Sequence, residues 1–323
     1  MRPLFFCIVG LTVISAAAFV TEAAVLGFIP VLVRGVPHAY SAFHMTGLHY
    51  VTVSCVLIPA MTVLYFEQGG SRSGRKNGLI VLCALVSIAI PILCVSRFQL
   101  VFAVILAVFT FCASQKNVSP WLFVVAVVAL IPCYVLLTVA RSHDVTYLNG
   151  IFEMKNSRMP IFVSQPYIYI ANNYENFDCL VKALPAHTWG IRMLFPVWAL
   201  TGLKFLYPYL VSFPIYVDKT ELTTVTLIYD VYYDFGIIGV LVFACILGAV
   251  CFFLVEKLRE MKNPMGYLFY GQMAIYMMLS FFTTWFSNPT TWFYFLVTAV
   301  LTFYCSVSCL LYTSDAADDT PCV

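Results

Sequence analysis

The sequence predicts an all-α protein with several membrane-spanning helices and one large external loop that contains short interfacial helices. Of its 323 residues, 62% are hydrophobic and 10% are charged, and the mean hydropathy is +0.92. A soluble domain carries about 25% charged residues, so these proportions indicate a lipid environment. The net charge of +2 and the absence of a basic face with interleaved aromatics in the sequence exclude a strongly basic nucleic-acid-binding protein.

Eight apolar runs approach the length of a membrane span. A helix needs about 20 apolar residues to cross a bilayer, because every backbone amide must find its partner within the segment. The runs lie at residues 4–26, 47–66, 79–95, 99–113, 121–140, 237–255, 267–286 and 291–311. The third and fourth nearly touch at Ser96-Arg97-Phe98, which predicts a tight helical hairpin. The first run resembles a signal peptide at Ala16 to Ala18, but it continues to Val33, which favours a retained helix.

The basic residues of the short loops predict the orientation. With the N-terminus in the cytoplasm, eight of them lie inside and two outside, as the positive-inside rule requires. The inner set is Arg2, Arg72, Arg75, Lys76, Lys116, Lys257, Arg259 and Lys262, and the outer set is Arg34 and Arg97. Residues 193–210 are apolar but interrupted by Pro196, Lys204 and Pro208, which favours an interfacial or re-entrant helix. A true span there would invert everything that follows it.

The interval of about 141–235 is the predicted external loop and the predicted location of function. It holds seven basic and eight acidic residues, close to half of the charges in the chain, and it is rich in tyrosine. So many aromatic residues are untypical of a disordered linker, and a loop of this length is usually functional.

The last residues of the chain need a separate interpretation. Residues 309–319, CLLYTSDAADD, resemble the in-frame translation of a sequencing-library adapter. We therefore expect a single polytopic membrane domain at residues 1–311, a non-native tail at 312–323, and a natural chain that continues past the eighth helix.

Arginines on the predicted outer side are the best candidates for binding an anion. A planar guanidinium donates two parallel hydrogen bonds, which suits the paired oxygens of a phosphate or diphosphate. Each of the loop arginines, taken alone, is more often an anchor for lipid headgroups. Together they predict a cationic outer mouth for an anionic, lipid-linked substrate. The set comprises Arg141, Arg158 and Arg192 in the long loop, with Arg97 and Arg34 in the short loops.

Proton transfer has several candidates, of which Asp234 and His143 come first. The others are His38, His44, His187 and Glu175. Glu22 is the one carboxylate within an apolar run, and a carboxylate at headgroup level and a functional group are equally good interpretations of it. The loop tyrosines and Trp189 could stack on sugar rings or belong to the membrane interface.

The sequence contains no motif for a metal or cofactor. It has no Gly-rich phosphate loop, nucleophile elbow, HExxH pair or paired metal carboxylates, and its cysteines show no CxxC spacing. We therefore expect no metal site and no cofactor, and any catalysis would be metal-independent or use dispersed ligands.

Several segments together resemble the oligosaccharide repeat-unit polymerases of the O-antigen polymerase (Wzy-type) group. The resemblance covers roughly residues 22–239, and its most specific parts are the Asn-rich and Asp-Phe-Gly segments. The arginine-to-glycine spacing described for some polymerases is not reproduced, and the helices are fewer than in a full-length member. The matching segments are residues 22–30, 40–44, 47–49, 96–97, 166–176 and 233–239.

The resemblance implies a metal-independent glycosyltransferase in the cytoplasmic membrane of a bacterium. It would join undecaprenyl-diphosphate-linked oligosaccharides on the outer face, with a flippase and a chain-length regulator as partners. Arg141 and Arg192 would bind the diphosphate and offset leaving-group charge, while Asp234 or His143 accepts the proton of the attacking hydroxyl. The expected substrate-binding residues are Arg97, Arg158, Tyr167, Asn172, Asn173, Asn176 and Glu22.

Two other functions compete with polymerisation. An O-antigen ligase-like transferase would move finished glycan to another acceptor and would produce capped products in place of ladders. A transporter or flippase of lipid-linked sugars would line a midplane site with charged or broken helices. The predicted spans contain no such charge other than Glu22 and no obvious repeat, so the polymerase is the favoured reading.

Overall fold

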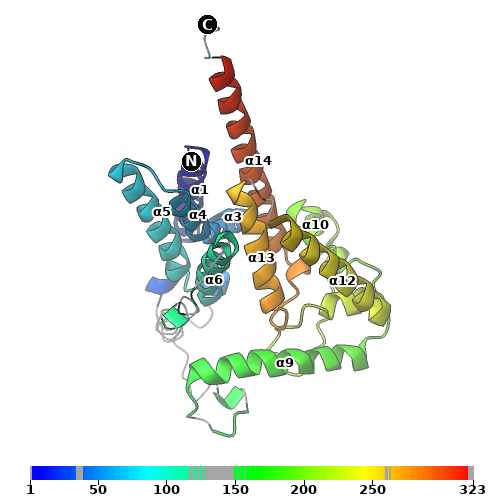
Figure 1. Ribbon diagram of the computed structural model, residues 1–323. Coiled ribbons are helices and arrows are strands. Elements are labelled where there is room, and N and C mark those ends of the chain that lie inside the picture. Colours follow the sequence, from blue (N-terminus) through cyan, green and yellow to red (C-terminus); the bar gives the residue numbers. More distant parts are fainter. Residues whose placement is uncertain are drawn as a thin grey trace. The chain divides into compact units, whose positions relative to one another are not determined.

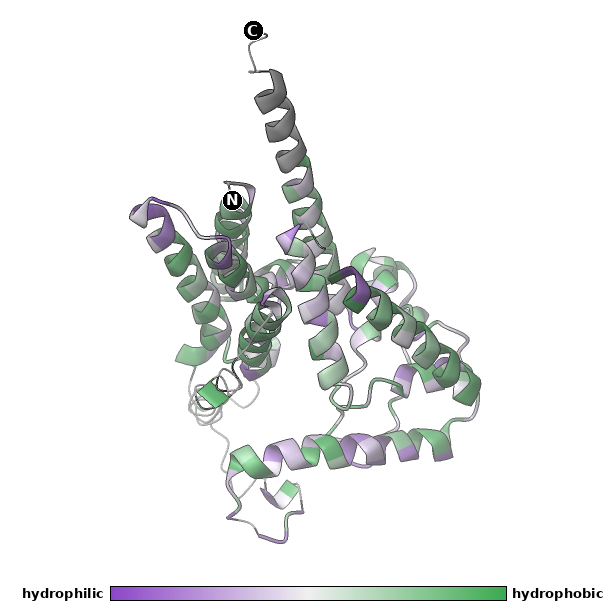
Figure 2. Ribbon diagram, in the orientation of Figure 1, coloured by the Kyte–Doolittle hydropathy of each residue, from purple (hydrophilic) through white to green (hydrophobic). Residues whose placement is uncertain are grey.

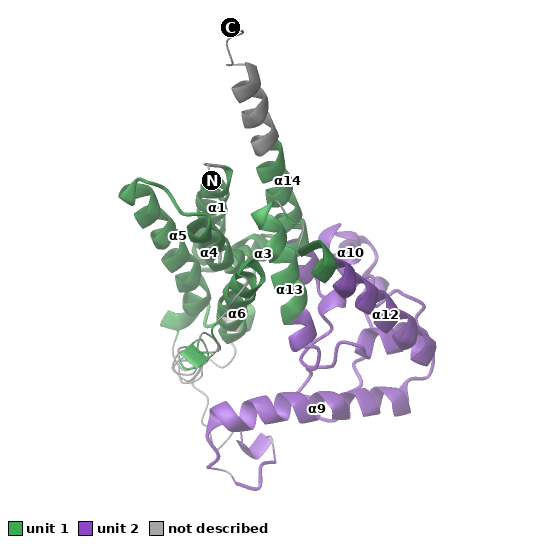
Figure 3. Cartoon of the chain, viewed as in Figure 1, with its two compact units in different colours: residues 1–130, 254–275, 294–323 green, residues 131–253, 276–293 purple. Residues whose placement is uncertain are grey.

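The computed structural model describes residues 2–33, 39–115, 119, 121, 124–125, 128, 149–151, 153–156, 158–258, 261 and 263–318. Every regular element in these residues is helical (Figure 1), which confirms the predicted fold class. Contacts divide the chain into two compact units (Figure 3). Unit 1 comprises residues 1–130, 254–275 and 294–323, and unit 2 comprises residues 131–253 and 276–293. The single domain and the non-native tail stay predictions.

Six helices in the described residues are long and apolar enough to cross a membrane, and each matches a predicted run. The chain is therefore an integral membrane protein with several spans, as its composition predicts. Figure 2 shows the long helices as hydrophobic over most of their length. The run at 121–140 lies outside the described residues except for four positions. The six spans are Pro3–Leu26, Leu48–Glu67, Gly74–Leu93, Arg97–Ser114, Tyr229–Leu258 and Pro289–Val307.

Unit 1 is built around the segment Leu48–Glu67. This segment consists of α3 (Leu48–Val53), η2 (Ser54–Leu57) and α4 (Ile58–Glu67), and its middle is fully buried. The helices packed around it are α1 (Arg2–Leu26), α5 (Gly74–Leu93) and α6 (Arg97–Ser114). The short elements η1 (Pro30–Leu32), α2 (Ala39–Ala42) and η4 (Pro264–Gly266) also belong to this unit.

The predicted tight hairpin between the third and fourth runs is confirmed. Helix α5 ends at Leu93, the next helix begins at Arg97, and the two pack together. Ser96 donates its backbone N–H to the carbonyl of Pro91 at 2.8 Å, and Val95 has a left-handed φ of 53°. Three residues between the helices are therefore enough to reverse the chain.

Unit 2 contains α9 (Ile161–Ala183), a cluster of short elements and α12 (Tyr229–Leu258) up to residue 253. The predicted interfacial segment 193–210 is divided into α10 (Phe195–Leu200), α11 (Leu203–Leu206) and η3 (Pro208–Leu210). None of these is long enough to span a bilayer, so the alternative of a true span at 193–210 is wrong. Its placement at the membrane interface stays a prediction.

The predicted span at 267–286 is wrong as a continuous helix. Helix α13 (Tyr267–Met278) has 12 residues and is followed by turns and η5 (Trp285–Ser287), before α14 (Pro289–Asp318) begins. The helix stops because other groups use the carbonyls that follow it. Leu227 donates its backbone N–H to Ser280 O at 2.7 Å, and Asn173 donates to Phe281 O at 2.6 Å. Hydropathy alone does not reveal such outside donors.

Helix α12 is interrupted near its start. Gly236 has a φ of 61° and a ψ of −154°, which lies outside the helical region and suits only glycine. The residues before this break are largely buried, whereas Ile237, Ile238 and Leu241 beyond it are 62–76% exposed. The break therefore separates a polar first turn from the apolar part of the helix.

Candidate functional site

Asp234 closes the turn that carries Arg192. Its side chain is fully buried, and it accepts hydrogen bonds from three donors. Oδ1 accepts from the Thr188 hydroxyl and from the Arg192 backbone N–H at 3.3 Å, and Oδ2 accepts from the Met193 N–H at 2.7 Å. Sequence analysis selected Asp234 and Arg192 separately, and the structure joins them across 41 intervening residues. With both oxygens occupied, Asp234 is better arranged to position the turn than to accept a proton.

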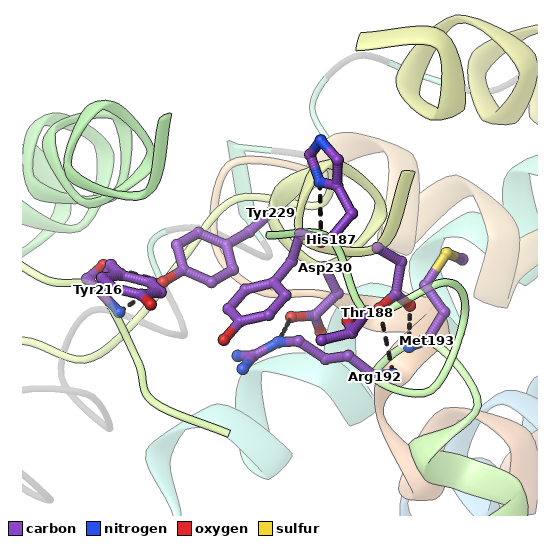
Figure 4. Close-up of polar contacts among 9 residues, drawn as sticks. His187, Thr188, Arg192, Met193, Tyr216, Tyr229 and Asp230 are labelled. Atoms are coloured by element: carbon purple, nitrogen blue, oxygen red, sulfur yellow. Dashed lines mark hydrogen bonds and ion pairs between the residues drawn. The ribbon is translucent and has the colours of Figure 1, made fainter. Parts of the chain in front are cut away.

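Asp230 holds the side chain of Arg192. It lies one helical turn before Asp234, and its Oδ1 accepts a hydrogen bond from Arg192 Nε within an ion pair. The guanidinium also lies over two rings, with its Cζ 4.6 Å from the centroid of Tyr233 and 5.4 Å from that of Tyr229. Cation–π contacts of this kind favour a fixed guanidinium. Figure 4 shows the Arg192 side chain beside Asp230.

A network behind the arginine fixes these aromatic rings. The Tyr229 hydroxyl donates to the carbonyl of Tyr216 at 2.9 Å and accepts from the Tyr216 N–H at 2.8 Å. Tyr229 and Tyr233 are buried with Leu180 and Val225 in one apolar cluster. The platform under Arg192 is therefore tied both to the core of unit 2 and to the chain at Tyr216.

The turn at 187–192 requires unusual backbone angles. Trp189 and Gly190 both have positive φ, at 54° and 97°, and the Trp189 N–H donates to the Asp234 carbonyl at 3.2 Å. His187 donates from Nδ1 to the carbonyl of Tyr233 at 3.2 Å. A Cβ on Gly236 would lie 2.9 Å from His187 Nε2, so the imidazole would have to shift, and the φ of 61° at this position itself favours glycine.

A cavity of about 370 Å³ opens beside the ion pair, and every lining residue belongs to unit 2. This volume falls within the range of small-molecule sites, about 300–1,000 Å³. One wall is charged, one is apolar and one carries hydroxyl and amide groups. The lining consists of Arg192 and Asp230, then Phe195, Leu210, Val211, Phe213 and Ile215, and finally Thr284, Ser287, Asn288 and Pro289.

The three predicted substrate-binding asparagines have a structural role. Asn172 donates to Leu222 O at 3.0 Å, and Asn176 donates to Leu222 O and Thr224 O, both at 2.8 Å. Asn173 donates to Phe281 O, and all three side chains are buried. They attach neighbouring loops to α9. Because the NH2 groups of all three side chains donate to backbone carbonyls within the protein, these asparagines are not part of the proposed site.

None of the remaining candidates in the described residues makes a contact with this cluster within unit 2, and several candidates lie outside the described residues. Arg158 and Tyr167 are exposed in unit 2, and Arg97 is buried at the first position of α6 in unit 1. Arg141, His143, His38 and Arg34 lie outside the described residues. Glu22 is fully buried in unit 1, where His49, Thr52 and the Met45 N–H contact its carboxylate. Within the described chain, no three His, Cys, Asp or Glu side chains gather closely enough to hold a metal ion.

Asp230 and Thr188, which hold the Arg192 turn, were missed in the sequence, as were the cavity-lining residues Thr284, Ser287 and Asn288. Asp230 precedes Asp234 by four residues, a spacing that places both carboxylates on one face of a helix and was available as a signal. Thr188 gives no such signal, since its role depends on the fold. Comparison with protein-family models, with curated proteins and with solved structures finds no match.

Proposed function

We propose that this chain is a glycosyltransferase of a bacterial cytoplasmic membrane, with its N-terminus in the cytoplasm. It would polymerise undecaprenyl-diphosphate-linked oligosaccharide repeat units on the outer face of that membrane. One observation carries the proposal, together with the sequence resemblance. A half-buried arginine, 15% exposed, is held in a fixed orientation on the wall of a ligand-sized cavity in a membrane protein with several spans.

Arg192 would bind the diphosphate of the lipid-linked substrate. Its Nε is used by Asp230, which leaves the two terminal nitrogens as the donors suited to paired phosphate oxygens. The ion pair is neutral overall, so recognition would depend on directed hydrogen bonds more than on net charge. The same donors would offset negative charge that develops on the leaving diphosphate. Asp230 and Asp234 would act as positioning residues.

The mixed lining of the cavity agrees with a substrate that has polar and apolar parts. Thr284, Ser287 and Asn288 offer hydroxyl and amide groups to sugar hydroxyls, while Phe213 and Ile215 offer apolar contact. Sugar rings present both kinds of surface, since their C–H faces are apolar.

The test is polymerisation of purified lipid-linked repeat units by the full chain in detergent, without any ion gradient. We expect a ladder of products that is lost in Arg192→Ala and not rescued in Arg192→Lys, because lysine lacks the planar fork. Lys182→Ala is the matched control, since Lys182 is 73% exposed and pairs with Asp178 on α9. Capped single products would indicate a ligase. A normal ladder in Arg192→Ala would refute the site.

A further inference from the structure

Three exposed apolar residues in unit 2 have no role in the site described above. Phe205, Leu206 and Tyr209 are 66%, 72% and 66% exposed, and we call them the apolar surface. They belong to α11 and η3, which pack together after α10. Apolar residues that gather on the outside of a protein mark a place where a lipid, a ligand or another protein binds.

The segment that carries the apolar surface makes its own backbone hydrogen bonds. Gly202, with a φ of 77°, turns the chain between α10 and α11, and its carbonyl accepts from the Phe205 N–H at 3.0 Å. At the other end of the segment, the Val211 N–H donates to Pro208 O at 3.2 Å. Backbone groups that are bonded locally can lie against hydrocarbon, where no water would replace a missing partner.

Charge is almost absent from this part of the chain. Lys204 is the only charged residue between Arg192 and Asp218. Its Nζ lies 5.1 Å from the centroid of the Phe205 ring, so the lysine stem follows the apolar surface. A lysine in this position can extend its ammonium group toward water or a phosphate. The composition therefore favours hydrocarbon chains over a partner rich in charged groups.

The apolar surface continues into the cavity beside Arg192. Leu210 and Val211, which follow Tyr209 in the chain, line that cavity. Val211 and Ile215 line the cavity and are also 36% and 50% exposed, so they form an apolar mouth. A ligand can therefore place an anionic end at the guanidinium and a hydrocarbon end on the apolar surface without leaving unit 2.

The cavity is too small to enclose a long lipid. Its volume of about 370 Å³ lies at the lower end of the range for drug-sized ligands, about 300–1,000 Å³. A diphosphate with the first part of its chain fills such a space, and the rest of a long chain must lie outside it. Exposure of that hydrocarbon to water is unfavourable. The adjoining apolar surface is where the protein can cover it.

We propose that the apolar surface binds the prenyl chain of a lipid diphosphate whose headgroup is held at Arg192. This inference rests on the proposed function for the diphosphate and deepens it, because it assigns residues that select a lipid-linked donor. The prenyl chain leaves the cavity past Val211 and lies on Phe205 and Leu206. A soluble sugar nucleotide has a diphosphate without such a chain, lacks this contact, and is therefore disfavoured as a substrate.

The first experiment locates the prenyl chain directly. The protein in detergent is irradiated with a long-chain prenyl diphosphate that carries a diazirine far from its headgroup, and mass spectrometry identifies the labelled peptides. We expect label in residues 203–211, which unlabelled undecaprenyl diphosphate removes by competition and an excess of phosphatidylglycerol does not. Label confined to other peptides, or equal competition by the phospholipid, would overturn the proposal.

The second experiment tests whether chain length matters. A bound ligand raises the thermal midpoint, so titration of the protein followed by this midpoint gives affinities. A variant with both Phe205→Ser and Leu206→Ser should bind undecaprenyl diphosphate about 10-fold more weakly or worse, because apolar contact contributes to binding in proportion to its area. Its affinity for geranyl diphosphate, whose short chain stays within the cavity, should be unchanged.

A variant with both Phe162→Ser and Val163→Ser is the matched control. These two exposed apolar residues lie at the start of α9, and neither lines the cavity. The control should keep wild-type affinity for both diphosphates. Unchanged affinity for undecaprenyl diphosphate in the Phe205 and Leu206 variant, or an equal loss for both diphosphates, would contradict the inference.

Arg192→Ala separates the failure of this inference from the failure of the proposed function. If it loses both diphosphates while the Phe205 and Leu206 variant loses neither, the apolar surface alone is refuted. If Arg192→Ala keeps wild-type affinity while the Phe205 and Leu206 variant loses the long-chain lipid, the diphosphate site fails and the apolar surface stands. A wild-type protein that binds neither diphosphate refutes both.

Discussion

Replacement of Asp234 by asparagine tests whether this carboxylate anchors the Arg192 turn. Asparagine has a similar shape but offers one acceptor oxygen where the carboxylate offers two. At least one of the backbone N–H groups of Arg192 and Met193 then loses its partner. A buried donor without a partner costs about 1–3 kcal/mol. Since every 1.4 kcal/mol is tenfold, the turn should open roughly 5 to 150 times more often.

Hydrogen exchange followed by mass spectrometry measures this opening directly, because local exchange reports local stability. Peptides that cover residues 188–194 should exchange faster in Asp234→Asn by that factor, while peptides from α5 stay unchanged. Thr188→Ala is the graded control, since it removes one donor and leaves both backbone N–H groups bonded to the carboxylate. If Asp234→Asn abolishes polymerisation but leaves hydrogen exchange at residues 188–194 unchanged, Asp234 does not anchor the turn. That result would favour the alternative role of Asp234 as a proton acceptor.

Two further perturbations follow from the geometry of unit 2. Gly236→Ala places a Cβ 2.9 Å from His187 Nε2 at a φ of 61°, so the thermal midpoint in detergent should fall by several degrees, for about 1–3 kcal/mol of strain. Gly248→Ala, with nothing within 4 Å, is the control, and equal midpoints would contradict the argument. The pKa of the Cys179 thiol is raised, mainly by burial and to a smaller extent by the negative charges of Asp218 and Asp178. Because the thiolate is the reactive form, alkylation of a variant that keeps only Cys179 should begin at higher pH in the folded chain than in the denatured chain. Asp178→Asn should make the difference between these two pH values smaller. Identical pH profiles would show that these neighbours do not act on the thiol.

The membrane spans were predictable because lipid imposes a simple rule on sequence. Where each backbone amide must bond inside its own segment, length and hydropathy suffice, and six of the eight runs are found as long helices. The prediction of a continuous helix at 267–286 was wrong because the backbone carbonyls of Ser280 and Phe281 accept hydrogen bonds from donors elsewhere in unit 2. Such pairing over more than fifty residues leaves no local trace in the sequence.

The candidate site was only partly predictable, for a related reason. Arg192 and Asp234 could be selected by residue type, but their contact depends on a turn with two positive φ values at Trp189 and Gly190. Asn176 was selected as a substrate-binding residue, but its NH2 group donates to backbone carbonyls. An amide can bind a sugar hydroxyl or a backbone carbonyl, and residue type alone does not distinguish the two. The burial of Glu22 could have been predicted, because this residue continues the buried face of its helix at i, i+3, i+4 and i+7 spacing.

The first turn of α12 shows how two carboxylates can be accommodated at the start of a membrane span. Asp230 and Asp234 precede a long apolar helix, where unpaired carboxylates would be costly. Both acids are paired with one turn of chain, Asp230 through the Arg192 side chain and Asp234 through backbone N–H groups. Gly236 then breaks the helix, so the polar turn need not follow the direction of the span. It follows that loss of either acid should disturb Arg192 while leaving the apolar helix beyond the break intact.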